Sequence, residues 1–169
     1  VMQYENATGW IIGEPNDGLR AMFTMMNNAR LGVGGQGIGV AEAAFQHSTE
    51  YALNRKQGKS TIQNKHGTII DHADVRRMLI SMRADIFASR SIELENAKAI
   101  DMANATEEPE WINKAAFLTP ITKVFGTEIG INISNLGVQI HGGMGFIEET
   151  GAAQFSRDVR VTAIYEGTN

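Results

Sequence analysis

The chain has 169 residues, of which 43% are hydrophobic and 20% charged, a composition typical of one globular domain with its own core. Its formal net charge of −4 argues against nucleic-acid binding, because phosphate binding relies on clustered Lys and Arg. It contains no cysteine, which excludes disulfides, cysteine-ligated zinc and a thiol nucleophile. No apolar stretch reaches the roughly 18–20 residues of a membrane span, so none is predicted.

The first 15 residues differ from the rest of the chain. Segment 9–15 is short, β-prone and bounded by Gly9 and Pro15, which predicts an edge strand or its remnant followed by a turn. Asn16 or Asp17 then offers a helix N-cap. Apolar residues at helical spacing follow directly and predict a first helix: Leu19, Met22, Phe23 and Met26.

A second helical stretch is predicted from Arg30 to about Lys56, and a long loop over 57–71. The first half of this stretch holds five glycines, each of which costs a free helix about 1 kcal/mol relative to Ala. Their spacing includes Gly-x-Gly-x-x-Gly at 32–37, but the dinucleotide fingerprint needs a preceding strand, and the preceding residues read as helix. We therefore interpret the glycines as points where two helix backbones approach closely.

Two more long helices are predicted. Asp71 can cap the first of them, which continues to about Ala103. Pro109 suits the start of the second. Pro120 lies inside that helix, where we expect a kink or a restart after Thr119. The predicted fold is all-α: an antiparallel up-and-down four-helix bundle with a short β remnant at its N-terminus.

Histidines and carboxylates do not form a recognisable metal motif. Helical bundles with two metals use Glu-x-x-His pairs, whereas this sequence has His47 and Glu50 in the reverse order and no Glu-x-x-His. We therefore expect no metal site and interpret His47, His66 and His72 as surface groups.

Three features could carry chemistry, and each has a simpler reading. The three glycines of segment 139–146 follow a helix end and could expose bare main chain to a planar or phosphorylated ligand, although a glycine C-cap explains one of them. Arg30 and Arg55 lie near opposite ends of one predicted helix and could bind pyrophosphate, or they could be solvated helix ends, which their spacing alone favours. Glu166 stands among apolar and small residues as a candidate general base, or as a surface residue before a turn.

Taken together, in order and at their spacing, these segments are far more specific than any one of them. They are Gly-Glu-Pro-Asn-Asp-Gly-Leu at 13–19, Asn-Asn-Ala-Arg at 27–30, Tyr-Ala-Leu-Asn-Arg-Lys-Gln-Gly at 51–58, Gln-Ile-His-Gly-Gly-Met-Gly-Phe at 139–146, Arg-Asp at 157–158 and Ile-Tyr-Glu-Gly-Thr-Asn at 164–169. Over essentially its whole length the sequence resembles the C-terminal helical domain of the acyl-CoA dehydrogenases. Segments 24–30 and 72–79 are most similar to the subgroup that includes 3-methylmercaptopropionyl-CoA dehydrogenases.

The resemblance implies an FAD-dependent oxidoreductase of fatty acid metabolism that introduces an α,β double bond into an acyl-CoA thioester. Glu166 would remove the α-proton, and the β-hydrogen would leave as hydride to flavin N5. The backbone N–H of Glu166 and a ribityl hydroxyl would stabilise the thioester oxygen. The family also implies a homodimer or homotetramer, electron-transfer flavoprotein as electron acceptor, and a location in the bacterial cytoplasm or the mitochondrial matrix.

The site residues are carried over position by position. Three match substrate contacts: Asn27, Arg30 and Gly167. Nine match FAD contacts, most of them to the FAD of a neighbouring subunit: Arg55, Gln57, Gln139, Ile140, His141, Gly142, Gly143, Thr168 and Asn169. The family pattern Arg-x-x-Phe-Gly is broken here, because Gly58 follows Gln57 without the Phe.

The resemblance also implies where the chain would sit in a longer protein. Residues 1–15 would be the end of a middle β-domain and its linker, and 16–169 the C-terminal bundle, truncated at its C-terminal side. The isolated chain would then be inactive and free of flavin. Two alternatives remain: an acyl-CoA oxidase that passes electrons to oxygen, and a non-catalytic helical scaffold for oligomerisation.

Overall fold

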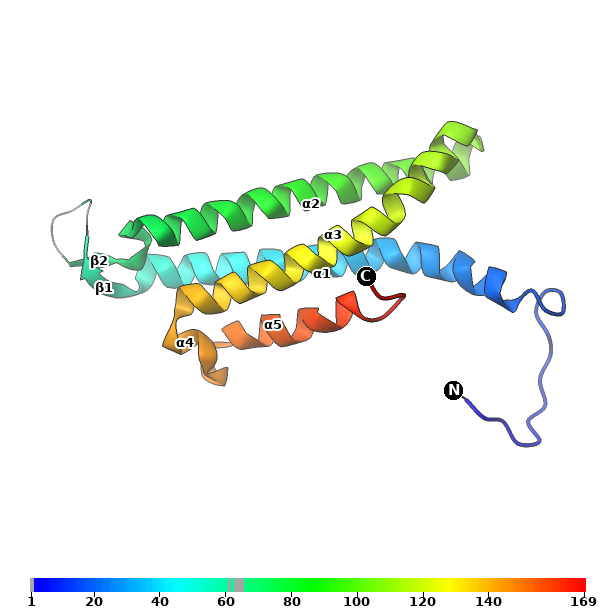
Figure 1. Ribbon diagram of the computed structural model, residues 1–169, viewed down its shortest axis with the longest axis horizontal. Helices are drawn as coiled ribbons and strands as arrows, with labels where there is room; N and C mark the ends of the chain where they lie inside the picture. The colour runs from blue at the N-terminus through cyan, green and yellow to red at the C-terminus, as the bar shows by residue number, and fades with distance from the viewer. Residues whose placement is uncertain (1, 61, 63–65) are drawn as a thin grey trace.

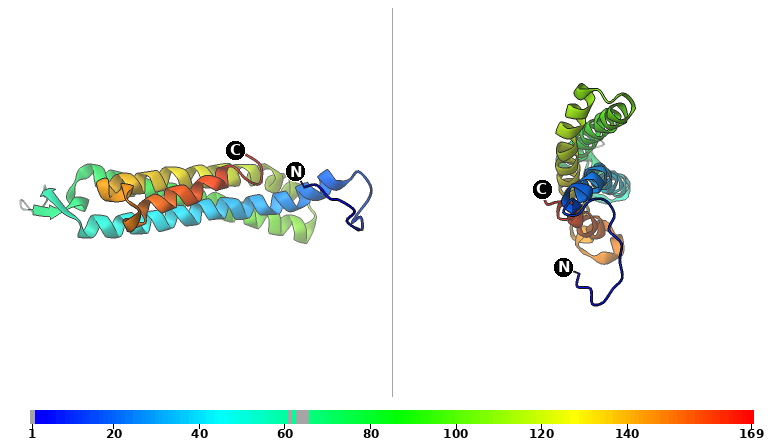
Figure 2. Two further views of the ribbon diagram at one scale, coloured as in Figure 1. Left: turned by 90° about the horizontal axis from the view of Figure 1, so that it is seen from below. Right: turned by 90° about the vertical axis from the view of Figure 1, so that its right-hand side faces the viewer.

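The computed structural model describes residues 2–60, 62 and 66–169. Four helices run alternately up and down along an elongated molecule: α1 (Gly18–Asn54), α2 (Ala73–Thr106), α3 (Pro109–His141) and the shorter α5 (Ala152–Arg160) (Figure 1). Helices α1 and α3 form a central pair, with α2 packed on one side of it and α5 on the other (Figures 1 and 2). The predicted all-α antiparallel bundle is confirmed. None of the helices in the described part of the chain is long and apolar enough to cross a membrane.

Short elements connect these helices at the two ends of the bundle. Between α1 and α2 lie an antiparallel hairpin and a 3-10 turn: β1 (Lys56–Lys59), β2 (His66–Thr68) and η1 (Ile69–Asp71). After α3 come α4 (Gly143–Phe146), η2 (Glu148–Thr150) and, following α5, η3 (Val161–Ala163). The region expected to be a long loop therefore contains a hairpin. Its base is closed by a hydrogen bond of 2.8 Å from the Ile69 N–H to the Arg55 carbonyl.

The N-terminal segment does not form the expected strand. No strand occurs in described residues 2–17, and Trp10 and Ile12 are 86% and 97% exposed. A strand needs a neighbour for its ladder of hydrogen bonds, and the described residues offer none to this segment. Asp17 does precede the first residue of α1, but its carboxylate binds Arg20 at 2.6 Å instead of the helix amides. The two helices predicted before and after Arg30 are one continuous helix.

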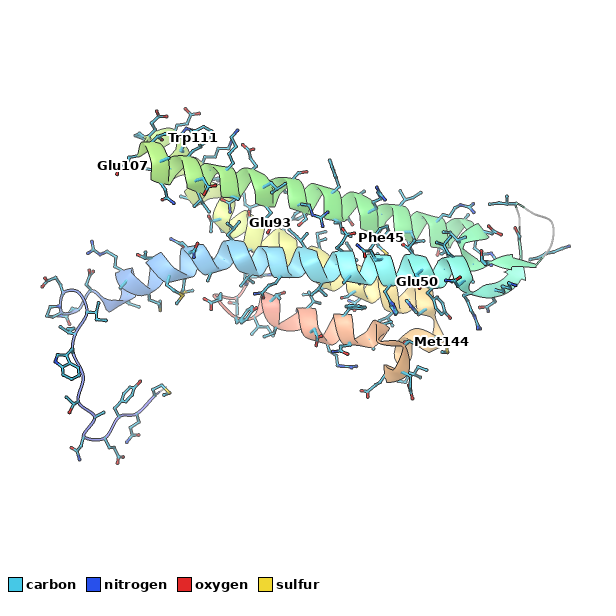
Figure 3. All side chains as sticks on the ribbon, turned by 180° about the vertical axis from the view of Figure 1, so that it is seen from behind. Phe45, Glu50, Glu93, Glu107, Trp111 and Met144 are labelled. Atoms are coloured by element: carbon cyan, nitrogen blue, oxygen red, sulfur yellow. The ribbon has the colours of Figure 1, made fainter. Side chains whose placement is uncertain are left out.

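Helices α2 and α3 begin close to where the sequence predicts. His72 rather than Asp71 occupies the N-cap of α2, because Asp71 belongs to the preceding 3-10 turn. Helix α3 starts at Pro109 with Glu108 as its N-cap. It continues through Pro120 without a restart and changes direction in its first half (Figure 1). The α2–α3 connection, with Glu107 and Trp111, lies at one end of the bundle, and Met144 and Glu50 lie toward the other (Figure 3).

Glycines allow α1 and α3 to cross with their backbones in contact. A Cβ on Gly37 would lie 2.4 Å from the carbonyl oxygen of Gly126, and one on Gly126 would lie 2.6 Å from that of Gly34. A Cβ on Gly130 would lie 2.8 Å from the Gly37 oxygen. Real Cβ atoms do not approach carbonyl oxygens so closely, so only glycine fits. The predicted close approach is confirmed, and two of the five glycines in the run make it.

Candidate functional site

The predicted site residues gather in two places on the bundle. The first is the end that carries the hairpin, where α1 and α3 finish. The second is the C-terminal turn, which we define as residues 166–169, lying beside the middle of α1 and α3 (Figure 1). Lys123 at the second place and His141 at the first lie on one helix, about 27 Å apart at roughly 1.5 Å per residue.

A cavity of about 800 Å³ occupies the hairpin end, and we call it the hairpin-end cavity. It is lined by seven of the nine predicted FAD-binding residues: Arg55, Gln57, Gln139, Ile140, His141, Gly142 and Gly143. Gly142 has a φ of +60°, and a Cβ added to it or to Gly143 would enter open space. The main chain at these two glycines is therefore bare toward a ligand, as the sequence suggested.

His141 is the buried polar group of this cavity, with 4% of its surface exposed. Its Nδ1 donates to the Gly137 carbonyl at 2.7 Å, since a carbonyl can only accept. Its ring stacks between Tyr51 and His47, with centroids 4.2 and 4.8 Å away. Burial lowers the pKa of His141 below its ordinary value of 6.5, and the nearby His47 lowers it further. The ring is therefore neutral at pH 7, and among the described residues its Nε2 has no hydrogen-bond partner.

The other histidines depart from the surface role expected of them. His47 is half-buried in the stack, and its Nε2 lies 2.9 Å from the Thr150 carbonyl. His72 is half-buried, lies 2.9 Å from the Gln57 carbonyl and lines the hairpin-end cavity. The side chain of His66 lies outside the described residues. In the described part of the chain no three histidine or carboxylate side chains gather as a metal site would require.

The C-terminal turn has an unusual backbone. Glu166 has a φ of +54° and Gly167 a φ of +87°. The left-handed region costs a residue with a side chain about 1–2 kcal/mol, so its surroundings must hold Glu166 there. Arg30 of α1 donates from Nε to the Glu166 carbonyl at 3.3 Å. The φ of Gly167 favours glycine, and a Cβ there would also lie 2.9 Å from Arg30 Nη2, which would have to shift.

Lys123 of α3 is a second cation on this turn, and the sequence analysis missed it. Only 2% of its surface is exposed, and its Nζ donates to the Gly167 carbonyl at 2.6 Å and to Asn169 Oδ1 at 2.7 Å. Asn169 in turn donates to Thr127 Oγ1 at 2.9 Å and to Glu128 Oε1 at 3.0 Å. Burial lowers the pKa of Lys123, and the Arg30 cation adds to this effect. No local signal in the sequence marks this lysine, because its partners lie more than 40 residues later in the chain.

The predicted substrate residues lie close to the same turn. Asn27 and Arg30 line a groove of about 450 Å³ between α1, α2 and α3. Its other polar lining residues are Thr24, Asn28, Asn104 and Thr119. Arg30 reaches from this groove to Gly167, so the structure brings all three predicted substrate residues together.

Comparison with known proteins identifies the family. A profile of the C-terminal domain of acyl-CoA dehydrogenases matches residues 16–169. The chain belongs to the acyl-CoA dehydrogenase family. Members of this family are flavoprotein oxidoreductases, and the match confirms the resemblance drawn from the sequence motifs.

Named relatives of this acyl-CoA dehydrogenase domain are longer proteins. A 3-methylmercaptopropionyl-CoA dehydrogenase of Ruegeria pomeroyi is 49% identical over 99% of this chain and 29% of its own length. A caffeyl-CoA reductase-Etf complex subunit of Acetobacterium woodii is 33% identical over 94% of this chain and 37% of its own length. The structure of butyryl-CoA dehydrogenase from Megasphaera elsdenii superimposes with a TM-score of 0.77 at 28% identity, over 93% of this chain and 37% of that one. The chain therefore spans about a third of the length of these relatives.

Proposed function

We propose that the chain is the C-terminal domain of a longer FAD-dependent enzyme that dehydrogenates an acyl-CoA thioester at its α and β carbons. In this proposal residues 1–15 end a middle β-domain and 16–169 form the bundle. The relatives support it, because this chain aligns with only 29% of the Ruegeria enzyme. The exposure of three consecutive large apolar residues, Trp10, Ile11 and Ile12, also supports a covering domain outside the chain, since contiguous exposed apolar surface is typical of interaction sites.

The observation that carries the proposal is the C-terminal turn. Glu166 would take the α-proton of the thioester, and within the described residues its carboxylate makes no ion pair or hydrogen bond that would compete with this role. The turn is anchored through its carbonyls to Arg30 and Lys123, which leaves the Glu166 side chain available to a substrate. A carboxylate held in place beside a thioester loses less entropy when it reacts than a freely moving one.

The residues that would hold FAD fit an extended, phosphorylated ligand. The guanidinium of Arg55 and the bare main chain at Gly142 and Gly143 suit the adenosine-diphosphate part. Thr168 and Asn169 belong to the other cluster, next to Glu166. Bound FAD would accept the β-hydrogen as hydride. The separation of the two clusters supports a homodimer or homotetramer in which the hairpin-end cavity serves the FAD of a neighbouring subunit.

The electron acceptor and location follow from the relatives. The name of the Acetobacterium woodii relative places that protein in a complex with Etf, which supports electron-transfer flavoprotein as the acceptor here. The bacterial sources of the relatives support a cytoplasmic enzyme.

Replacement of the base in the full-length enzyme tests the proposal. Glu166→Gln should leave the spectrum of bound flavin unchanged and lower turnover about 10²- to 10⁴-fold, the usual contribution of a general base. Glu149→Gln, which changes an exposed carboxylate in η2, should have little effect. Near-normal turnover of Glu166→Gln would refute the assignment of the base.

Two further readouts separate the alternatives. Hydrogen peroxide formed without an added electron acceptor would identify an oxidase. A wild-type full-length protein purified without flavin would support a non-catalytic scaffold.

A further inference from the structure

Lys123 is a basic residue buried inside the bundle. Its side chain is 2% exposed, and among the described residues it forms no ion pair within 4 Å of a carboxylate. Burying a charge is unfavourable unless hydrogen bonds replace its water. It donates instead to the Gly167 carbonyl and to Asn169 Oδ1, which both belong to the C-terminal turn. The lysine therefore contributes to this turn and not to an ion-pair network of the bundle.

Side chains from two helices donate hydrogen bonds to consecutive carbonyls of the C-terminal turn. Arg30 on α1 binds the Glu166 carbonyl at 3.3 Å, and Lys123 on α3 binds the Gly167 carbonyl at 2.6 Å. Holding two successive carbonyl oxygens fixes two successive peptide planes, because each peptide unit is rigid. The φ of +54° at Glu166 is unfavourable for a residue with a side chain and persists only where neighbouring groups impose it.

The far side of the turn is tied to the same helix. Asn169 accepts from Lys123 and donates to Thr127 and Glu128, one turn further along α3. The backbone N–H of Asn169 also reaches the Ala163 carbonyl at 3.3 Å. Loss of the lysine would therefore release the Gly167 carbonyl and remove one of the three side-chain hydrogen bonds of Asn169, so the turn would be held less tightly.

We propose that Lys123 is a positioning residue for the reaction: by binding Gly167 and Asn169 it holds the C-terminal turn so that Glu166 faces the α-carbon of the substrate. The inference rests on the proposed function of Glu166. Lys123 itself touches neither substrate nor cofactor in this role, and acts through the backbone of the base.

The test compares variants of the full-length, FAD-loaded enzyme. Lys123→Met keeps the apolar stem and removes the ammonium. It should lower kcat about a hundredfold, because a base displaced by about 1 Å loses that much rate. KM for acyl-CoA, flavin content and Tm should stay close to wild type. The deuterium isotope effect at the α-position should rise, because proton removal becomes slower than the steps around it.

Two further substitutions keep the result interpretable. Lys123→Arg restores a charged donor and should recover part of kcat. Lys114→Met removes a more exposed lysine from the same helix, paired with Glu95, and should leave kcat and the isotope effect unchanged. If Lys123→Met does not fold, Lys123→Gln tests the inference instead. The shorter, neutral glutamine side chain cannot reach both the Gly167 carbonyl and Asn169 Oδ1, so this variant should show the same loss of kcat.

Wild-type kcat and isotope effect in a folded Lys123→Met or Lys123→Gln enzyme would overturn the inference. A fall in Tm with no change in kcat or isotope effect would assign the lysine to stability alone and overturn it equally. Glu166→Gln, measured in parallel, separates this failure from failure of the proposed function: an active Glu166→Gln enzyme refutes the base itself, whereas an inactive one beside an active Lys123→Met enzyme refutes only the positioning role.

Discussion

His141 and Lys123 are both buried basic residues of α3, and their surroundings give them opposite charge states at neutral pH. The His141 ring stacks on Tyr51 and His47 and donates to a backbone carbonyl through Nδ1. The neutral imidazole can make all of these contacts, so no positive charge is needed. The Lys123 ammonium is surrounded by oxygen atoms of the C-terminal turn, which stabilise its charge. Burial alone would favour the neutral form of each, and hydrogen-bond partners make the difference.

Acid should destabilise the chain partly through His141. Its folded-state pKa lies below 6.5, so the unfolded chain binds a proton at this position first as the pH falls. The contribution of His141 to the free energy of unfolding is fully present above about pH 6.5. It is lost as the pH falls from that value to the lower pKa of the folded state. His141→Phe keeps an aromatic ring in the stack and cannot be protonated. Urea unfolding at about pH 7.5 and about pH 5.5 should show a smaller loss of unfolding free energy in this variant than in wild type.

The control for this experiment is chosen from the groups around His141. His47 and Tyr51 are the titratable groups in ring contact with it, both from α1, and they remain in the variant. His72→Phe removes an imidazole that lies outside the stack, so its pH dependence should resemble wild type. An identical acid dependence of wild type and His141→Phe would show that this ring does not contribute.

At the scale of elements, the bundle depends on how closely α1 and α3 approach. Their glycines bring backbone against backbone, whereas α2 packs on this pair through larger side chains such as Met82 and Ile86. This crossing sets the position of Arg30 on one helix and Lys123 on the other, so it also sets where the C-terminal turn can be held.

A methyl group at the crossing should therefore weaken the fold. The Cβ of Gly37→Ala would lie 2.4 Å from the Gly126 oxygen, and separating the helices should lower the free energy of unfolding by about 1–3 kcal/mol. Gly39→Ala is the matched control on the same helix, because its Cβ meets nothing within 4 Å. It should raise stability by about 0.5–1 kcal/mol through helix propensity. Denaturant unfolding measures both, and a loss of similar size in the two variants would argue against the crossing as the cause.

At the scale of the whole molecule, the chain is an elongated bundle, and the hollows lined by predicted site residues lie at different positions along it. One is the hairpin-end cavity, and the other is the groove next to Arg30. Several large apolar side chains remain in solvent near the ends, among them Ile12 at 97% and Phe146 at 83% exposure. Exposed apolar surface of this kind is typical of faces that bind another domain or subunit.

The isolated chain should accordingly be colourless and inactive. The predicted FAD residues fall into two groups at different positions along the bundle, so neither group by itself offers a flavin more than part of its partners. The 169-residue chain, expressed alone, should purify without flavin absorbance and show no acyl-CoA turnover, beside a full-length enzyme that shows both. Flavin retained by the isolated chain through purification would contradict this expectation.

Local sequence determined much of this protein. The helix start at Pro109 and the close approach of Gly34 and Gly37 follow from proline and glycine chemistry, which act over a few residues. The ordered motifs from 13 to 169 were enough to indicate the family. Local rules failed where a partner was needed: segment 9–15 has no strand beside it, and the hairpin in the expected loop depends on a bond between Ile69 and Arg55.

Only the tertiary structure decided which residues meet. Arg55 and His141 are far apart in sequence and line one cavity because α1 and α3 end at the same end of the bundle. Lys123 looked like an ordinary helix residue, and its role depends on a turn more than 40 residues later folding back onto α3. Helical periodicity and helix caps depend on residues that are close together in the sequence. A buried cation and the carbonyls that satisfy it are brought together only when helices pack, so no local pattern could reveal them.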